Sequence, residues 1–214
     1  MIARFFSTTG KLILASASPR RKALLQDIGL EFEIIEAQVE EKPRAGETPE
    51  DFVLRAGRDK AGIVSRENPE SWVLGADTVV VHGGRILGKP RNAEEALTVL
   101  LSLSGQKHRV HTGFCLENAV KKVSVSRLVT TEVYFSSFSK EIAAAYVATG
   151  EPLDKAGSYG IQGGGGLLVE RINGSYSNVV GLPLAEVIQE MLGCKVIAPG
   201  HRYMKSLIPA SKHP

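Results

Sequence analysis

The order of strand-like and helix-like segments is the strongest constraint on the fold of this chain. An apolar run at residues 12–15 has the length of a strand, and a helix start follows it directly. Ser18 can cap that helix and Pro19 suits its first position. Strands and helices alternate in this way early in the chain, whereas strands crowd together later. This order predicts an α/β domain with a mixed β-sheet flanked by helices.

Capping residues and glycine stops define the expected segments. Asn173-Gly174 resembles a tight hairpin turn into a further strand. The run Gly163–Gly166 predicts a flexible or tightly turned loop. The expected helices are 19–28, one starting at 49, 92–105, 139–150 and 183–193; the expected strands are 12–15, 32–39, one or two within 71–82, 109–116, 123–135, 167–172 and 177–180.

The composition is that of an ordinary globular protein. The chain has 214 residues, of which 43% are hydrophobic and 23% charged, so one domain with a sizeable core is expected. We place this domain at 12–193, in two lobes around a cleft, between a flexible segment at 1–11 and a loosely held tail at 194–214. The first segment lacks acidic residues, so a short mitochondrial presequence is the alternative to simple disorder.

The composition and the cysteine pattern argue against several classes of protein. A net charge of +3 with 6% aromatic residues does not indicate a nucleic-acid-binding protein. No apolar run approaches the ~20 residues that span a bilayer. The two cysteines, far apart and without a CxxC partner, are typical of reduced thiols, and we expect a cytoplasmic location.

The segment Ser16–Arg21 is a candidate phosphate site. It lies between a strand and a helix, where free backbone N–H groups and a partial positive charge favour anions. Two serine hydroxyls and the guanidinium groups of Arg20 and Arg21 add donors and charge. An ordinary helix cap followed by two solvated arginines explains the same residues equally well.

Two charged residues fall where apolar ones are expected. Lys60 lies on the apolar face of the helix that starts at 49. A lysine in such a position more often extends its amine to water than toward bound anions, so the first alternative is favoured. Asp77 interrupts the apolar stretch 72–81, and a buried carboxylate needs a cation, a metal or hydrogen-bond donors. Glu41, after the expected strand 32–39, could join Asp77 in binding Mg²⁺ or Mn²⁺, although adjacent acids such as Glu40 and Glu41 are usually only solvated.

Later loops contain further candidates. Lys89 and the pair Asp154-Lys155 stand beside turn residues, and singly they are typical of surface loops. Gln162 places a side-chain amide among glycines, where it could read the edge of a base, although an ordinary polar loop residue explains it equally well. HExxH, nucleophile-elbow and GxxxxGK[ST] patterns are missing from the sequence. The residues alone therefore indicate a polyanion site with acids nearby, most simply for a phosphate ester.

The motifs LASASPRR, GADT, GKP and DKAGSYGIQG together resemble the Maf family of nucleoside triphosphate pyrophosphatases, over about residues 12–192. The resemblance implies an elongated α/β fold with a deep nucleotide-binding cleft, related to inosine triphosphate pyrophosphatases, and a homodimer. Within the family, Arg20, Thr78 and Gln162 resemble the branch that acts on dTTP and UTP.

The resemblance also implies roles for single residues. Asp77 is expected to accept a proton and, with Glu41, to bind a divalent metal. The residues expected to bind phosphates are Ser16, Arg21, Lys60, Lys89 and Lys155, and Asp154 is carried over with them. The expected reaction is attack of a water on the α-phosphorus with release of pyrophosphate. The alternative is a nucleotide-binding regulator of cell division with little turnover, for which an acid beside the triphosphate would be unnecessary.

Overall fold

A mixed β-sheet is the frame of the protein, of which the computed structural model describes residues 5–200. Within these residues the sheet has seven strands in the order β3-β2-β4-β6-β7-β8, and β5 pairs with β4. Strand β2 is parallel to β3 and β4, and the remaining pairs are antiparallel. The strands are β2 (Leu12–Ala15), β3 (Glu33–Ile34), β4 (Trp72–His82), β5 (Arg85–Leu87), β6 (Lys107–Asn118), β7 (Val123–Phe135) and β8 (Val169–Asn173).

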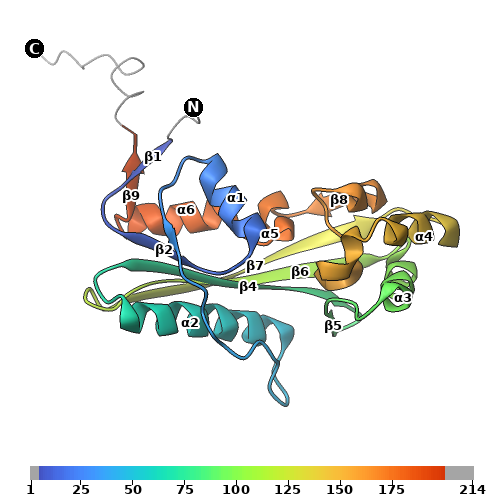
Figure 1. The fold of residues 1–214 in the computed structure, drawn as a ribbon, viewed down its shortest axis with the longest axis horizontal. Coiled ribbons are helices and arrows are strands. Elements are labelled where there is room, and N and C mark those ends of the chain that lie inside the picture. The colour runs from blue at the N-terminus through green and yellow to red at the C-terminus, as the bar shows by residue number, and fades with distance from the viewer. Residues whose placement is uncertain (1–4, 201–214) are drawn as a thin grey trace, which may run out of the picture.

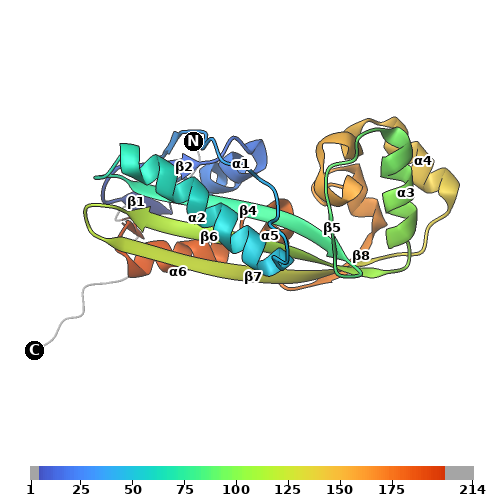
Figure 2. The same cartoon turned by 90° about the horizontal axis from the view of Figure 1, so that it is seen from below.

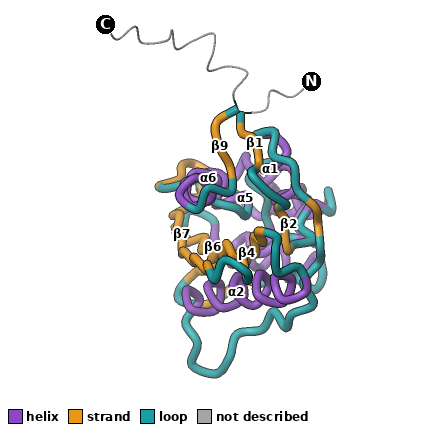
Figure 3. The backbone as a smooth tube through the Cα atoms, turned by 90° about the vertical axis from the view of Figure 1, so that its left-hand side faces the viewer, coloured by secondary structure: helices purple, strands orange, loops and turns teal. Residues whose placement is uncertain are grey.

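Helices cover both faces of the sheet. Helix α2 lies along one face, and α1, α5 and α6 lie on the other (Figures 1 and 3). Helices α3 and α4 form a second lobe at one end with three 3₁₀ turns, which makes the molecule elongated (Figure 2). The helices are α1 (Pro19–Asp27), α2 (Pro49–Glu67), α3 (Ala93–Leu103), α4 (Lys140–Ala148), α5 (Tyr176–Val180) and α6 (Leu184–Gly193); the turns are η1 (Glu151–Asp154), η2 (Ala156–Ser158) and η3 (Gly164–Leu168).

The apolar run of β2 is continuous because both of its faces are covered. Successive side chains of a strand point to opposite faces. Leu12 and Leu14 pack in the cluster that includes α1 and α6, whereas Ile13 and Ala15 pack against α2. The expected α/β fold with a mixed, helix-flanked sheet is confirmed.

The predicted helix starts are confirmed by their capping bonds. The side chains of Ser18, Thr48, Asn92 and Ser139 each accept a hydrogen bond from the backbone N–H three residues later. Each cap satisfies a donor that the first turn leaves unpaired. These four positions fix where the chain turns from loop into helix. Within residues 5–200, no helix combines the length and apolar character that crossing a bilayer requires.

The predicted hairpin at Asn173-Gly174 is wrong. Residues 176–180 form helix α5 rather than a strand, and Ser175 caps it by accepting a hydrogen bond from the Asn178 backbone N–H. The Asn178 side chain is fully buried and donates to the Val110 carbonyl and the Thr131 hydroxyl of the sheet. This anchoring holds the segment against the sheet as a helical turn, which local turn signals do not reveal.

The interval 71–82, expected to hold one strand or two, forms the single strand β4. Two other expectations need correction. The expected strand 32–39 is regular only at Glu33–Ile34. The terminal segments, expected to lack regular structure, contribute β1 (Phe6–Thr8) and β9 (Ile197–Pro199), which pair antiparallel. The remainder of these two segments, 1–4 and 201–214, lies outside the described residues.

Candidate active site

A pocket of about 730 Å³ opens where strand β2 ends. The last residue of β2, Ala15, is paired with Gly75, and β4 continues beyond that point. The loop from β2 into α1 therefore faces the next residues of β4, Asp77 and Thr78. The crevice at the carboxyl ends of parallel strands is the usual place for a ligand in such sheets.

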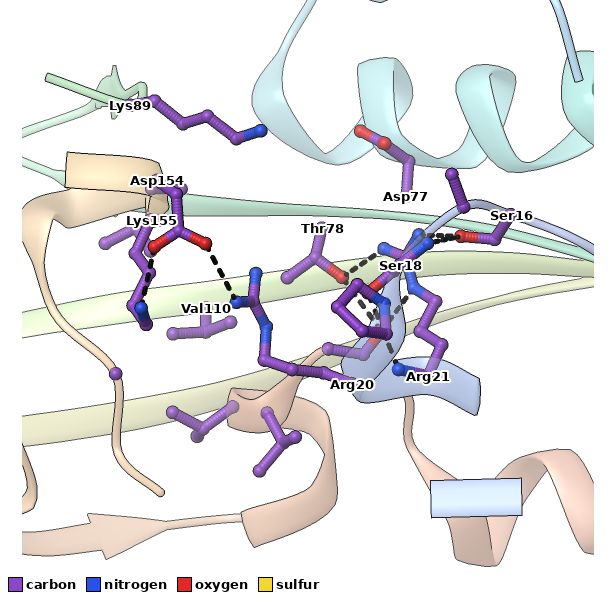
Figure 4. A pocket seen from close by; sticks show the side chains of 18 of the residues that line it. Ser16, Ser18, Arg20, Arg21, Asp77, Thr78, Lys89, Val110, Asp154 and Lys155 are labelled. Carbon is purple, nitrogen blue, oxygen red and sulfur yellow. Dashed lines mark hydrogen bonds and ion pairs between the residues drawn. The ribbon is translucent and has the colours of Figure 1, made fainter. Parts of the chain in front are cut away.

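Every residue that the sequence predicts for the site lines this one pocket. They come from distant parts of the chain, and Figure 4 shows most of them around a shared space. The predicted residues in the lining are Ser16, Arg20, Arg21, Glu41, Lys60, Asp77, Thr78, Lys89, Asp154, Lys155 and Gln162. The structure thus brings the candidates together, while their individual roles stay predictions.

Lys60 is the centre of a buried ionic cluster. Its Nζ lies 2.7 Å from Asp77 Oδ1 and 2.7 Å from Glu41 Oε1, and its side chain is only 6% exposed. The amine also points toward the Ala76 carbonyl, at 3.4 Å. The idea that Lys60 snorkels to water is therefore wrong, because the amine turns inward from α2 to the carboxylates. Lys60 supplies the cation that the buried Asp77 requires.

Glu41 reaches the cluster from the loop between β3 and α2. Burial by itself would raise its pKa, but the hydrogen bond and charge of Lys60, aided by Arg21 and Lys89, hold the pKa below its usual value. Its side chain remains 57% exposed. Glu41 is thus an ionised carboxylate between the solvent and Lys60.

Glu41 and Asp77 fit a divalent cation only as a partial site. Both carboxylates face the same part of the pocket, because each contacts the Lys60 amine. Residues 5–200 contain no cluster of three or more His, Cys, Asp or Glu side chains that could hold a metal alone. Mg²⁺ is commonly bound by one or two carboxylates together with substrate phosphates and waters. The donor set fits an ion that arrives with a phosphorylated ligand.

Arg21 is buried behind the helix start and is held by three protein acceptors (Figure 4). Its Nε donates to the Gly181 carbonyl at 2.8 Å, and its terminal nitrogens donate to Ser16 Oγ at 3.1 Å and to Thr78 Oγ1 at 3.0 Å. Burial lowers its pKa, and the charges of Asp77 and Glu41 oppose that shift. A guanidinium has five N–H donors, so two of them have no acceptor among residues 5–200.

The hydroxyl of Thr78 is engaged within the protein. It accepts from Arg21, lies 2.9 Å from Thr112 Oγ1 and donates to the Gly181 carbonyl at 3.1 Å. In this arrangement Thr78 orients Arg21, and its contribution to base selection stays a prediction.

The opposite wall of the pocket belongs to the second lobe. Lys155 Nζ donates to the Glu151 carbonyl at 2.6 Å and to Asp154 Oδ1 at 2.7 Å. Arg20 Nη1 lies 3.9 Å from Asp154 Oδ2, a long ion pair between partly exposed groups. These contacts place a cation from each lobe on facing sides of the pocket, as Figure 4 shows.

Lys89 and Gln162 are the freest of the predicted residues. Both are exposed and line the pocket. In Figure 4 the amine of Lys89 points toward the space beside Asp77. The amide of Gln162 makes no hydrogen bond within residues 5–200, so its acceptor and donors are available to a ligand.

Other lining residues were not predicted from the sequence. Val110, Val179 and Val180 give the pocket an apolar surface, and Glu151 and Tyr159 flank the loop that holds Gln162. The valines follow ordinary strand and helix patterns, so no local signal could have singled them out. Glu151 follows Gly150 in a polar loop and is equally inconspicuous.

The charges that line the pocket cancel formally. Five lysines and arginines face five acids, the latter including Glu36 and Glu151 besides the predicted ones. A pocket for a polyanion that relied on protein cations alone would carry an excess of positive charge. The lining alone therefore provides no excess of positive charge for a polyanion.

Comparison with solved structures finds a partial similarity. The Ham1 protein of Staphylococcus aureus is 14% identical, covering 59% of this chain and 72% of its own, with a TM-score of 0.42.

Sequence relatives match nearly the whole chain. A protein of Desulfotalea psychrophila named dTTP/UTP pyrophosphatase is 53% identical over 187 residues, which are 87% of this chain and 96% of that protein. A protein of the same name from Geobacter metallireducens is 45% identical, covering 85% of this chain and 94% of its own. The family model described as Maf-like protein matches residues 11–193. The chain therefore belongs to the Maf family.

Proposed function

We propose that this protein is a nucleoside triphosphate pyrophosphatase that hydrolyses dTTP and UTP to the monophosphate and pyrophosphate. The relatives that match at 45–53% identity carry this name, and they match almost from end to end. The observation that carries the proposal is the placement of Asp77. A carboxylate beside Lys60 in a pocket lined by further lysines and arginines serves hydrolysis of a polyanion, whereas simple binding would be weakened by it.

The cationic side chains bind the triphosphate. The buried Arg21 offers its two remaining N–H groups at the start of α1, next to Ser16. Lys89 and Lys155 add charge from the second lobe. Arg21 and Lys155 are held by protein acceptors before the substrate arrives, so less reorganisation of these two groups is needed as charge develops on the phosphate oxygens.

Asp77 accepts a proton from the attacking water. Only one of its carboxylate oxygens contacts Lys60, which leaves the other to orient the water toward the α-phosphorus. A Mg²⁺ or Mn²⁺ ion held by Asp77 and Glu41 would neutralise phosphate charge and stabilise the leaving pyrophosphate. The balanced formal charge of the pocket supports the need for such an ion.

The base is proposed to contact residues from both lobes of the pocket. Arg20, Thr78 and Gln162 are proposed to select a pyrimidine by hydrogen bonding. The apolar side chains of Val110 and Val180 provide a surface on which a flat base can pack. Modified pyrimidine nucleotides are included among the proposed substrates.

The test is pyrophosphate release from a panel of nucleoside triphosphates with Mg²⁺ or Mn²⁺. We expect preferential turnover of dTTP and UTP, and a loss of at least about 100-fold in kcat for Asp77→Asn, as is typical when a general base is removed. The matched control is Asp59→Asn, because Asp59 lies on α2 outside this pocket and pairs with Arg55. This control should retain full activity.

Two results would contradict the proposal in different ways. Turnover of purine triphosphates in place of dTTP and UTP would retain the reaction and refute the specificity. Nucleotide binding with either metal but without pyrophosphate release would favour the nucleotide-binding regulator. The homodimer, the cytoplasmic location and the absence of nucleic-acid or membrane partners stay predictions from the sequence.

A further inference from the structure

The four-glycine loop that carries Gln162 is held by two side chains of the second lobe. Tyr146, on α4, is 3% exposed, and its hydroxyl accepts a hydrogen bond from the Gly160 N–H at 3.1 Å. Glu151 Oε2 accepts one from the Gly164 N–H at 2.8 Å. These two N–H groups lie two residues before and two residues after Gln162. The loop is therefore fixed on both sides of the amide.

The two holding groups are also joined to each other. The Tyr146 hydroxyl donates to Glu151 Oε1 at 2.9 Å, so one continuous chain of hydrogen bonds runs from Gly160 to Gly164. Burial by itself would raise the pKa of Glu151, but the bonds from Gly164 and Tyr146 hold that pKa below its usual value. Glu151 thus remains an ionised acceptor, and hydrogen bonds to an ionised group are the stronger kind.

The glycines are required by the closeness of this contact. A Cβ at Gly165 would lie 2.6 Å from the Tyr146 hydroxyl oxygen and 2.8 Å from the Gly160 carbonyl oxygen, which is backbone. A Cβ at Gly163 would collide with the Glu151 carboxylate and displace it from its bond to Gly164. The glycine run therefore permits a rigid attachment and does not simply give flexibility.

We propose that Tyr146 and Glu151 are positioning residues for base selection, which fix the backbone of Gly160–Gly164 so that the Gln162 amide meets the base in one orientation. This inference rests on the proposed function. The amide of Gln162 makes no hydrogen bond within the described residues, so its orientation depends on the backbone that carries it. A held backbone restricts where the Gln162 amide can reach, so the amide cannot move to match a different base edge, and the wrong base is left with unpaired groups.

The test measures kcat and KM for dTTP and for CTP, whose base differs at the edge that an amide reads. Tyr146→Phe removes the hydroxyl that links both sides of the loop. We expect the ratio of kcat/KM for dTTP over CTP to fall about tenfold, a change typical of one lost hydrogen bond in a selective site. The kcat for dTTP should stay within about twofold, since Lys60 and Asp77 are untouched.

A matched control is available on the sheet. The Tyr134 hydroxyl donates to Glu132 Oε2 at 3.0 Å, outside the pocket. Tyr134→Phe removes a similar tyrosine–glutamate hydrogen bond and should leave the ratio unchanged. Glu151→Gln is the second variant, in case Tyr146→Phe folds poorly, and should lower the ratio in the same direction.

A double-mutant cycle separates positioning from general destabilisation. If Tyr146 acts through Gln162, then Tyr146→Phe should not change the ratio further in a Gln162→Ala background. An equal loss for both substrates, or an additive effect in the double variant, overturns the positioning role. If Gln162→Ala alone leaves the ratio unchanged, the base selection in the proposed function fails together with this inference. If Gln162→Ala lowers the ratio and neither positioning variant does, only this inference fails.

Discussion

Two glycines of helix α2 offer a matched test of how the helix is held against the sheet. Gly57 and Gly62 both lie in the interior of this 19-residue helix. A Cβ at Gly57 would lie 2.7 Å from the Gly113 carbonyl oxygen and 3.3 Å from Phe114 Cα, both backbone atoms of β6. A Cβ at Gly62 would meet only the ends of flexible side chains, at 3.7 Å or more. The two positions therefore differ in sterics but share their helical context.

Two effects determine the expected free energies of unfolding of the two alanine variants: helix propensity and steric overlap. Alanine in place of glycine in a helix stabilises by about 0.5–1 kcal/mol. Gly62→Ala should show this gain undiminished. Gly57→Ala adds overpacking against backbone that cannot yield, which typically costs about 1–3 kcal/mol. The difference between the variants isolates the steric cost and should lie in that range.

The assay is urea unfolding of both variants beside the parent protein, with thermal unfolding as a second measure. For a chain of this size, each kcal/mol corresponds to about 2–4 °C in Tm. Gly57→Ala should also lower turnover, because Lys60 lies one turn further along α2 and its amine must reach Asp77. Equal stability of Gly57→Ala and Gly62→Ala would refute the inference that α2 touches the sheet at backbone distance.

Two further predictions concern buried ionisable groups. Lys60→Met leaves the carboxylate of Asp77 buried without its cation and should lower the free energy of unfolding by about 3–5 kcal/mol, measured in urea. The double variant Lys60→Met/Asp77→Asn should recover part of this stability. An equal loss of stability in the single and the double variant would contradict the pairing of Lys60 with Asp77. Burial lowers the pKa of His108 to about 3, so the unfolded chain binds a proton that the folded protein does not. Stability should fall as the pH drops from 6.5 toward 3, by up to about 1.4 kcal/mol per pH unit from this group. Urea unfolding at pH 7 and 5 should show a shallower fall for His108→Gln, and an unchanged slope would exclude His108 as a source.

The sequence predicts the parts of this protein that depend on local patterns. The cap at Ser18 and the continuous apolar run of β2 fix the strand–loop–helix unit at the pocket. Lys60 was predicted as a site residue because it is a charged residue on the apolar face of α2. Asp77 was predicted because it is a charged residue within an apolar strand. The direction of the Lys60 amine was beyond this reasoning, because only the fold shows that Asp77 and Glu41 stand within its reach.

The features that were not predicted from the sequence depend on contacts between distant segments. Glu151 is thirteen residues from Gly164, and their hydrogen bond exists because the second lobe folds the chain back on itself. Residues 177–180 of helix α5 were predicted as a strand because Asn173-Gly174 resembles a hairpin turn, while the buried Asn178 that anchors α5 to the sheet carries no local signal. Both errors arise where tertiary contacts decide the outcome.

The two lobes share their longest strands, and this has a consequence for the pocket between them. Strand β6 contributes Val110 to the core of the second lobe, and Phe114 and Leu116 to the core around α1 and α6. A continuous hydrogen-bonded strand joins the two cores, so the spacing of the pocket walls is set by the sheet. The long, partly exposed pair of Arg20 with Asp154 adds little to that spacing. Arg20 can therefore leave Asp154 for a group of a bound nucleotide without changing the separation of the two lobes, which the shared strands maintain.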